Sequence, residues 1–401
     1  METLRLQFPA LTQAGLVYLD NAATTQKPQV VLDAMNAFYQ HDNANVHRAA
    51  HRLSARATRA YEGARRQLAR FINAPQEETL IFTSGTTDGM NLLANSLGDL
   101  RLQPADWVLV DQWAHHASIV PWQQACLRHQ CQLAPIPMTT AGRLDFDAYQ
   151  QLLQRRPKIV VLTAVSNALG CRIDLPRFIA AAKAVEATVI IDGAQLMAHQ
   201  TVDVQALDCD FLVFSGHKMY GPTGIGVLWG KAQWLNAMAP YRFGGEMITQ
   251  VSFQHSTFNQ LPFKFEAGTP AIAEAIGLGA AAQWLTEQNR VDLAAHEQAL
   301  LQYAQQQLRT IKSIILYSAF DDNIGSVAFN LDGEHHQDVA SWLDQAGVAI
   351  RSGHHCCQPL MQHLAIKGCC RLSIAPYNRR ADIDAAIAAI QDYLDFITDE
   401  H

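Results

Sequence analysis

Two side chains in the middle of the chain have types and positions that suit one kind of cofactor chemistry. Asp192 ends an apolar run at 188–192, and Lys218 follows a later apolar run inside a glycine-rich turn. A lysine amine can hold an aldehyde as a Schiff base, and a carboxylate can keep a pyridine nitrogen protonated. Together the two groups predict a pyridoxal phosphate site. Taken alone, a lysine in such a turn is more often a solvated lysine or a phosphate contact. Taken alone, Asp192 is equally typical of a structural ion pair.

Further polar residues follow other apolar runs and suit the same cofactor. The segment 84–89 contains Thr86 and Thr87 between an expected strand and an expected helix, where free N–H groups and hydroxyls can bind phosphate. His115 follows the run that ends at Asp111, and its ring could stack on a planar cofactor. Asn167 follows the run at 159–165 and could donate to a ring oxygen. Each pattern also has a purely structural interpretation. Thr86 and Thr87 could cap a helix, His115 could be an ordinary surface or core histidine, and Asn167 could belong to a turn.

A second kind of chemistry is indicated by the loop at 351–359. Cys356 stands there among histidines, glycine, proline and Arg351. Nearby cations favour a thiolate, which is the nucleophilic form of cysteine, whereas most free cysteines are buried and inert. Arg371 begins the run at 371–378, where a guanidinium can clamp a substrate carboxylate or form an ordinary ion pair.

The elements that must position these residues have the pattern of a parallel sheet with crossover helices. Ligands of such sheets bind beyond the carboxyl ends of the strands, which is where most of the polar motifs fall. Strands are expected at 79–83, 107–111, 159–164, 188–192, 211–215 and 226–229. Helices are expected between them at 87–97, 122–128 and 175–185.

The C-terminal third predicts a smaller α+β domain. Helices are expected at 271–290, 291–308, 338–345 and 382–395, and strands at 325–330, 348–351 and 370–374. We therefore expect an α/β chain with a large cofactor-binding domain at 17–262 and a small domain formed by 1–16 and 263–401, which carries the cysteine loop.

Composition excludes several classes of function. The 401 residues have a net charge of −7, which argues against a nucleic-acid-binding protein. No apolar run reaches membrane-spanning length and the N-terminus has no signal-peptide pattern, so we expect a cytoplasmic protein. The eight cysteines are then expected to be free thiols. The adjacent pairs Cys356-Cys357 and Cys369-Cys370 lack the spacer of a zinc site, so no metal is expected.

These motifs resemble the class V (fold-type I) pyridoxal-phosphate-dependent aminotransferase family over nearly the whole chain, from the segment at 18–25 to the final helix. The branch with the greatest similarity is the group II cysteine desulfurases of the SufS and CsdA type. The most specific pieces are Asn45-Val-His-Arg48, Asp192-Gly-Ala-Gln195, Ser215-Gly-His-Lys218 and Arg351-Ser-Gly-His-His-Cys356-Cys-Gln-Pro359.

The resemblance implies a role for each matched residue. Lys218 would hold the cofactor and move the proton, Asp192 would pair with the pyridine N–H, His115 would stack on the ring, and Cys356 would accept sulfur. Gln195 and Asn167 would contact the ring oxygen, and Arg371 would hold the substrate carboxylate with help from Asn167 and Arg48. The phosphate would be bound by Thr86, Thr87, Ser215 and His217, and by Thr269 from a neighbouring subunit of a homodimer.

The implied reaction converts L-cysteine to L-alanine and an enzyme persulfide on Cys356. Activity on L-cysteine sulfinate and L-selenocysteine is also implied, with sulfur passed to a SufE/CsdE-like acceptor for iron–sulfur cluster or other sulfur-cofactor assembly. Another class V aminotransferase or a kynureninase-like enzyme is the alternative, and a sulfur-delivery scaffold or an inactive cofactor-binding protein are further ones.

Five positions depart from the family pattern. Cys357 stands where alanine is usual, and it could share or resolve the persulfide. The pair Cys369-Cys370 is unusual and is expected to be buried beside Arg371. Phe243 precedes two glycines where a glycine triplet is common, and it could reshape the substrate entrance. Asp88 replaces a usual glutamate.

Overall fold

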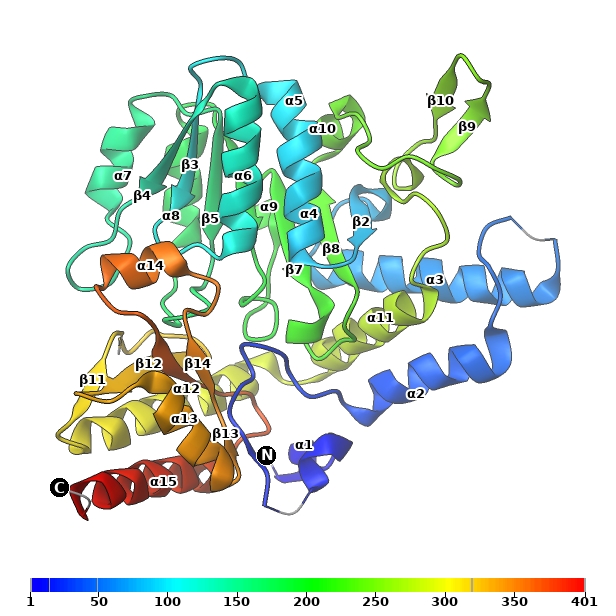
Figure 1. Ribbon diagram of the computed structural model, residues 1–401. Helices are drawn as coiled ribbons and strands as arrows, with labels where there is room; N and C mark the ends of the chain where they lie inside the picture. The colour runs from blue at the N-terminus through cyan, green and yellow to red at the C-terminus, as the bar shows by residue number, and fades with distance from the viewer. Residues whose placement is uncertain (1, 14, 49, 319, 400–401) are drawn as a thin grey trace.

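A seven-stranded sheet forms the centre of the molecule (Figure 1). The computed structural model describes residues 2–13, 15–48, 50–318 and 320–399. Neighbouring strands run parallel except that β8 is antiparallel to both of its neighbours. In sheet order the strands are β2 (Leu80–Thr83), β8 (Gly226–Gly230), β7 (Phe211–Ser215), β6 (Thr188–Asp192), β5 (Ile159–Thr163), β3 (Trp107–Asp111) and β4 (Gln132–Ile136).

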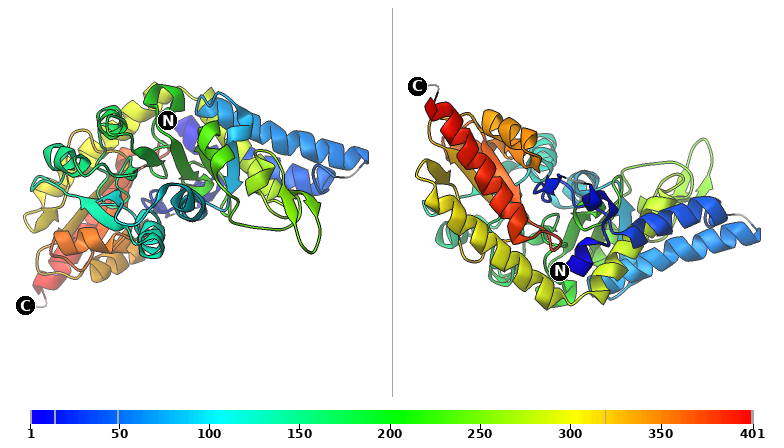
Figure 2. Two further views of the ribbon diagram at one scale, coloured as in Figure 1. Left: turned by 90° about the horizontal axis from the view of Figure 1, so that it is seen from above. Right: turned by 90° about the horizontal axis from the view of Figure 1, so that it is seen from below.

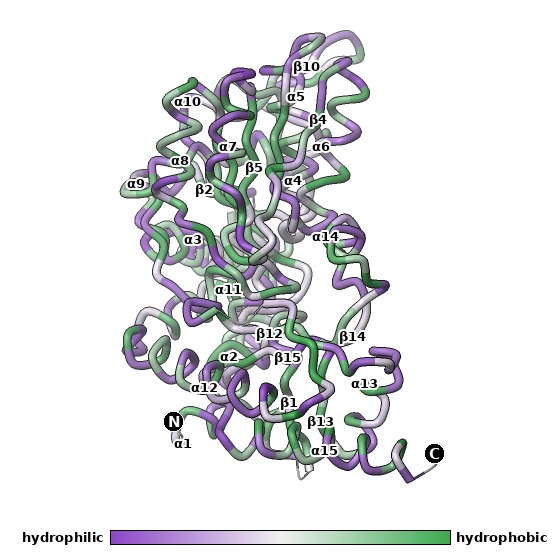
Figure 3. The backbone as a smooth tube through the Cα atoms, turned by 90° about the vertical axis from the view of Figure 1, so that its left-hand side faces the viewer, coloured by the Kyte–Doolittle hydropathy of each residue, from purple (hydrophilic) through white to green (hydrophobic). Residues whose placement is uncertain are grey.

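The strands are apolar throughout because both faces of the sheet are covered. Along β5, for example, Ile159 and Val161 belong to one buried cluster while Val160 and Leu162 belong to another. The hydropathy tube shows the hydrophobic colour gathered on these central strands (Figure 3). The expected strands at 107–111, 188–192 and 211–215 are confirmed, and the other three agree within one residue.

β4 is the strand of this sheet that the sequence did not predict. It is an edge strand, only partly buried, and it contains Pro135. Proline cannot donate to a strand ladder, so it is tolerated in a sheet at an edge and weakens the strand pattern in the sequence.

Helices pack on both faces of the sheet. α6 begins six residues before the expected start at 122, because His115 caps it by accepting from the Ala117 N–H, and it continues through Pro121. α4 continues into a π-helical turn at Leu93–Leu97. The helices of this region are α4 (Thr86–Leu92), α5 (Gly98–Arg101), α6 (His116–His129), α7 (Phe146–Leu153), α8 (Leu175–Lys183), α9 (Val204–Leu207) and α10 (Ala232–Ala237).

Three further helices form a layer that extends away from the sheet (Figures 1 and 2). α11 (Ile272–Glu287) packs against α3 (Arg52–Phe71) and α2 (Gln29–Ala37). α1 (Glu2–Arg5) lies at the N-terminal end of the chain, and the hairpin of β9 (Ile248–Val251) and β10 (Ser256–Phe258) projects beyond the sheet. None of the helices in the described part of the chain has the length and apolarity needed to cross a membrane.

A second, four-stranded antiparallel sheet forms the C-terminal unit, as expected for an α+β arrangement. Its order is β11 (Ile314–Leu316), β12 (Ser326–Leu331), β15 (Cys369–Ser373) and β14 (Arg351–Gly353). Its helices are α12 (Arg290–Thr310), α13 (His336–Gln345), α14 (Gln358–His363) and α15 (Arg380–Asp399). Seen from below, α12 and α15 lie side by side under this unit (Figure 2).

The N-terminal segment joins the two units. β1 (Val17–Tyr18) pairs in parallel with β13 (Val348–Ala349), and Asp20 forms a bridge with Ser373. Residues 17–20 therefore lie against the C-terminal unit, while α11 packs on the large one. The domain boundaries at 16/17 and 262/263 stay a prediction.

Candidate active site

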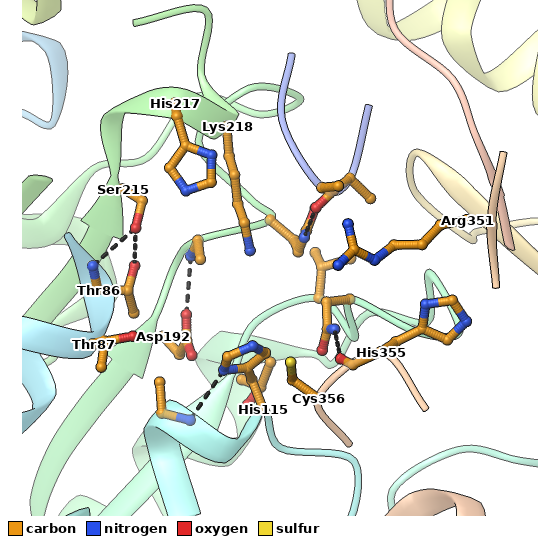
Figure 4. A pocket seen from close by; sticks show the side chains of 18 of the residues that line it. Thr86, Thr87, His115, Asp192, Ser215, His217, Lys218, Arg351, His355 and Cys356 are labelled. Carbon is orange, nitrogen blue, oxygen red and sulfur yellow. Dashed lines mark hydrogen bonds between the residues drawn. The ribbon is translucent and has the colours of Figure 1, made fainter. Parts of the chain in front are cut away.

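A cavity of about 220 Å³ lies at the carboxyl ends of the central strands, between the two units. Figure 4 shows hydroxyl-bearing side chains and His217 at one end and Cys356, Arg351 and His355 at the other, with Lys218 between them. Of the residues predicted for the site, the cavity is lined by Thr86, Thr87, His115, Asn167, Asp192, Gln195, Ser215, His217, Lys218, Cys356 and Arg371.

The hydroxyl end of the cavity is formed where α4 begins beside β7. Ser215 Oγ accepts from the Thr86 N–H at 2.8 Å and lies 2.8 Å from Thr86 Oγ1. The close approach of the backbone depends on two glycines. A methyl group on Gly226 would lie 2.6 Å from the Cα of Gly85. Hydroxyls and N–H groups at a helix start are donors suited to a phosphate.

Asp192 ends β6 at the base of the cavity and is 3% exposed. Its Oδ2 accepts from Ser118 Oγ at 2.7 Å and its Oδ1 from the Ala194 N–H at 3.0 Å. No ion-pair partner faces this carboxylate among the described residues. A buried carboxylate needs a cation or donor, so the cavity fits a pyridinium N–H at this point.

Lys218 lies in a short 3-10 turn after β7, and its amine points into the cavity (Figure 4). Burial lowers its pKa, while the charge of Asp192 opposes that shift. The preceding carbonyl, His217 O, accepts from Thr24 Oγ1 at 3.0 Å and from Lys27 Nζ at 3.0 Å. The turn that carries Lys218 is therefore fixed by the N-terminal segment. An amine with a lowered pKa suits attachment to an aldehyde.

His115 faces the cavity as a neutral ring. Burial, with a contribution from the charge of Lys218, lowers its pKa to about 4. Its Nδ1 accepts from the Ala117 N–H at 3.0 Å, which fixes the ring at the start of α6. A neutral, fixed imidazole can stack on a planar cofactor.

Cys356 and Cys357 have different environments although they are adjacent. Cys356 is half-buried, and its sulfur is directed into the cavity (Figure 4). Cys357 is fully buried and its thiol donates to Asn167 Oδ1 at 3.0 Å. Burial raises the pKa of the Cys357 thiol. This environment gives no support to a persulfide-sharing role for Cys357.

Arg371 is held from both sides at the end of the cavity opposite the hydroxyls. Its Nη1 donates to Asn167 O at 2.7 Å, and its Nη2 donates to Asp20 Oδ1 at 2.9 Å. Its buried Nε has no hydrogen-bond partner in the described part of the chain. Arg351 is its register partner on β14 and lies 3.6 Å from Asp20 Oδ2. This end of the cavity is thus suited to an anionic group.

Two amides at the site are engaged by the protein itself. Gln195 Nε2 donates to Ala22 O at 2.7 Å, and Asn167 Nδ2 donates to His355 O at 2.7 Å. Both side chains are therefore fixed in orientation beside the cavity.

Arg48 and Thr269 lie outside this cavity. Arg48 is 56% exposed and pairs with Glu246 at 2.5 Å. Thr269 lines a second cavity together with Glu266. Phe243 is 67% exposed and contacts Phe258 at a ring distance of 5.9 Å, so it does not shape the entrance from within its own chain.

The adjacent Cys369 and Cys370 are both buried, as expected. Successive side chains of a strand point to opposite faces, so Cys369 packs in the central core and Cys370 in the core of the C-terminal unit. Cys370 also donates to His336 O at 3.2 Å. Asp88 lies in the first turn of α4, where it accepts from Ser84 and Arg242 and so performs a structural role.

Sequence reasoning missed Thr163 and Asp20, and it named Arg351 and the loop histidines only as neighbours that favour a Cys356 thiolate. Arg351 and His355 line the cavity, and so does Thr163 at the end of β5. Asp20 supports Arg371 from a different segment. The end of an expected strand is the signal that could have identified Thr163, whereas the partner of Asp20 lies 351 residues away.

Comparisons with known proteins agree with the cavity's composition. Residues 17–386 match the family "Aminotransferase class-V". A probable cysteine desulfurase of Vibrio cholerae is 47% identical over 99% of both chains. The crystal structure of the cysteine desulfurase CsdA (S-sulfonic acid) from Escherichia coli superposes with a TM-score of 0.92 at 39% identity, covering 98% of each chain. An apo cysteine desulfurase of Thermococcus onnurineus has a TM-score of 0.94 at 34% identity, covering 98% of this chain and 97% of the other.

Proposed function

The chain belongs to the class-V aminotransferase family, and from that premise we propose that it is a cysteine desulfurase. It takes sulfur from L-cysteine onto Cys356 and releases L-alanine. The observation that carries this proposal is that Cys356 lines the same cavity as Lys218 and Asp192. A transaminase does not need a thiol at that place, whereas a sulfur acceptor does.

Pyridoxal phosphate is the cofactor of this family, and the residues of the cavity fit it. Asp192 would meet its pyridine nitrogen, His115 its ring face and Lys218 its aldehyde. The hydroxyl end, with Thr86, Thr87, Ser215 and His217, would hold its phosphate, and Gln195 and Asn167 would contact its ring oxygen. The chemistry it supplies when bound is withdrawal of electrons from the substrate, which weakens the Cα–H and Cβ–S bonds.

The protein's own groups then perform the reaction. Arg371 binds the substrate carboxylate, with Arg351 beside it, and the Lys218 amine removes the proton at Cα. The Cys356 thiolate attacks the substrate sulfur, so an S–S bond forms as the Cβ–S bond breaks. The electron pair of the broken bond stays with the substrate carbon, which takes up protons to become alanine. Cys356 is left as a persulfide.

The proposal is tested with purified holoenzyme, L-cysteine and quantified alanine and sulfide. We expect Lys218→Ala to lose the cofactor absorbance band and all turnover. Cys356→Ala is expected to keep the band and to lose alanine formation from cysteine. If wild-type protein transaminates cysteine and forms no alanine, the alternative of another class V aminotransferase or a kynureninase-like enzyme replaces this one.

We infer that the enzyme also acts on L-cysteine sulfinate and L-selenocysteine. Sulfite and selenium leave more readily than sulfide, so these substrates do not require the Cys356 nucleophile. Retained alanine formation from cysteine sulfinate in Cys356→Ala supports this wider specificity, and parallel loss on both substrates contradicts it.

We further propose a homodimer that passes sulfur to a SufE/CsdE-like acceptor, for iron–sulfur cluster or other sulfur-cofactor assembly. Thr269 and Arg48 lie outside the cavity of their own chain, which suits residues that serve a neighbouring subunit's phosphate and substrate. The eight free thiols suit the cytoplasm. Sedimentation of the holoenzyme tests the dimer, and stimulation of turnover by an added acceptor protein tests the delivery role.

A further inference from the structure

The loop that carries Cys356 has an unfavourable backbone conformation. His355 and Cys356 have φ angles of 50° and 56°, in the left-handed region that non-glycine residues rarely adopt. Each such residue costs about 1–2 kcal/mol and persists where the surroundings hold it. Something outside the loop must therefore fix the backbone beside the nucleophile.

Asn167 and Cys369 contact His355, and His116 makes the contacts on the Cys356 side of the loop. The His116 N–H donates to Cys356 O at 2.8 Å, and the His116 ring accepts from the Gln358 N–H through Nε2 at 3.1 Å. The ring also packs against the His354 ring at a centroid distance of 5.7 Å. His354 in turn accepts from the Cys356 N–H through Nδ1 at 3.0 Å. The N–H and C=O groups of Cys356 and the N–H group of Gln358 therefore all have hydrogen-bond partners.

The position of His116 links this loop to the rest of the site. It is the first residue of α6, directly after His115, and two residues before Ser118, which donates to Asp192. One helical turn thus contacts the cofactor-facing carboxylate, carries the expected stacking ring and holds the cysteine loop. The first turn of α6 therefore sets how far the cysteine loop lies from His115 and Asp192.

We propose that His116 is a positioning residue that holds the Cys356 loop on the first turn of α6 and so directs the sulfur of Cys356 into the cavity. This inference rests on the proposed function, in which Cys356 receives the sulfur. Acceptance at Nε2 requires a neutral ring with its proton on Nδ1. Burial, with a contribution from His354, lowers the pKa of His116, which favours that form.

The experiment compares His116→Ala, which removes the ring acceptor, with His116→Gln, whose side-chain oxygen can occupy the position of Nε2. His129→Ala is the matched control, because His129 lies on the same helix and pairs with Asp99 away from the loop. Each holoenzyme is examined by amide hydrogen exchange at 354–358, by the alkylation rate of Cys356 with iodoacetamide, by the cofactor absorbance band and by kcat and KM for L-cysteine.

Loss of one hydrogen bond should raise local opening by roughly 5–10-fold. We therefore expect His116→Ala to raise amide exchange at Gln358 and to change the alkylation rate of Cys356 by that factor. We expect kcat to fall by a similar factor with little change in KM or in the absorbance band, since the binding groups stay in place. His116→Gln should restore most of the kcat, and His129→Ala should match wild type.

Unchanged exchange and alkylation in His116→Ala would overturn the proposal, as would raised exchange with unchanged kcat. If His116→Ala does not fold, His354→Ala, which removes the acceptor on the other side, must show the same changes. Wild-type protein that makes no alanine from cysteine would contradict the proposed function, while exchange and alkylation would still decide whether His116 holds the loop.

Discussion

Neighbouring thiols in this site differ because of their surroundings rather than their identity. Cys356 opens to the cavity, whereas Cys357 is buried against Asn167. Burial in apolar surroundings disfavours a thiolate, and the thiolate is the reactive form. Cys357 therefore serves in packing, where its thiol helps to fix the Asn167 side chain.

The location of the transferred sulfur tests this difference. After L-cysteine is added to wild type, we expect mass spectrometry of the loop peptide to place the extra sulfur on Cys356, and the same in Cys357→Ala. Cys357→Ala should also lower the free energy of unfolding by about 1–2 kcal/mol, because it leaves a small void and an unpaired Asn167 oxygen. Sulfur found on Cys357 in wild type would contradict the assignment.

Lys27 is a second residue whose properties depend on its surroundings. Its amine donates to His217 O and to Thr25 O, and it faces no carboxylate among the described residues. Burial lowers its pKa to about 7. Between about pH 7 and 10.5 the unfolded chain therefore binds more protons at this residue than the folded chain does.

Stability should depend on pH accordingly. Above the unfolded pKa the amine is neutral in both states and carries no penalty, whereas the cost of charging it in the folded state grows as pH falls to about 7. We expect wild type to gain free energy of unfolding relative to Lys27→Met as pH is raised from 7 to 9.5, measured by urea denaturation of the holoenzymes. A difference between the two proteins that is constant over this range would show that Lys27 titrates normally.

At the scale of elements, the hydroxyl end of the cavity depends on how closely β8 approaches the start of α4. Gly226 opens β8, and a methyl group there would lie 2.6 Å from Gly85 Cα and 2.6 Å from Phe214 O. Both contacts are with backbone atoms, which cannot rotate away. The turn that presents Thr86 would have to move.

Gly226→Ala is therefore expected to lower the free energy of unfolding by about 1–3 kcal/mol and to weaken cofactor retention. Gly63→Ala is the matched control, because Gly63 lies in α3 and its nearest neighbour is an Arg66 side-chain atom 3.9 Å away. That change should stabilise the helix by about 0.5–1 kcal/mol. Thermal melts and dialysis against buffer without cofactor measure the two effects, and equal behaviour of the two variants would contradict the argument.

At the scale of the whole molecule, three distant segments meet at Arg371. Asp20 comes from the N-terminal segment, Asn167 from the turn after β5 and Arg371 from the C-terminal sheet. The pairing of β1 with β13 brings Asp20 into place. The end of the cavity that contains Arg371 is formed only when both units and the N-terminal segment are assembled.

Removing the Asp20 charge should leave a buried guanidinium without its partner. We expect Asp20→Asn to lower the free energy of unfolding by about 3 kcal/mol, the usual cost of breaking a buried ion pair. L-alanine should then stabilise the variant more than it stabilises wild type, because its carboxylate can supply the missing charge. Thermal melts with and without L-alanine check both effects, and an equal ligand-induced shift would argue against carboxylate binding at Arg371.

The sequence by itself determined the central strands and most of the candidate site. A strand covered on both faces must be apolar throughout, so β3, β6 and β7 are visible as short apolar runs with polar residues at their ends. Because carboxyl ends of parallel strands meet at one edge, the residues after these runs converge on a single cavity.

Only the tertiary structure decided the rest, because the deciding contacts join residues far apart in sequence. α3 buries Arg65 against Glu266, which lies 201 residues away, and no feature of the spacing within α3 indicates that partner. The same holds for Asp20 at Arg371 and for the position of Thr269 and Arg48 outside the cavity. The burial of Cys357 and the hydrogen bonds between His116 and the cysteine loop likewise depend on how the two units pack. The spacing of residues along the chain does not encode that packing.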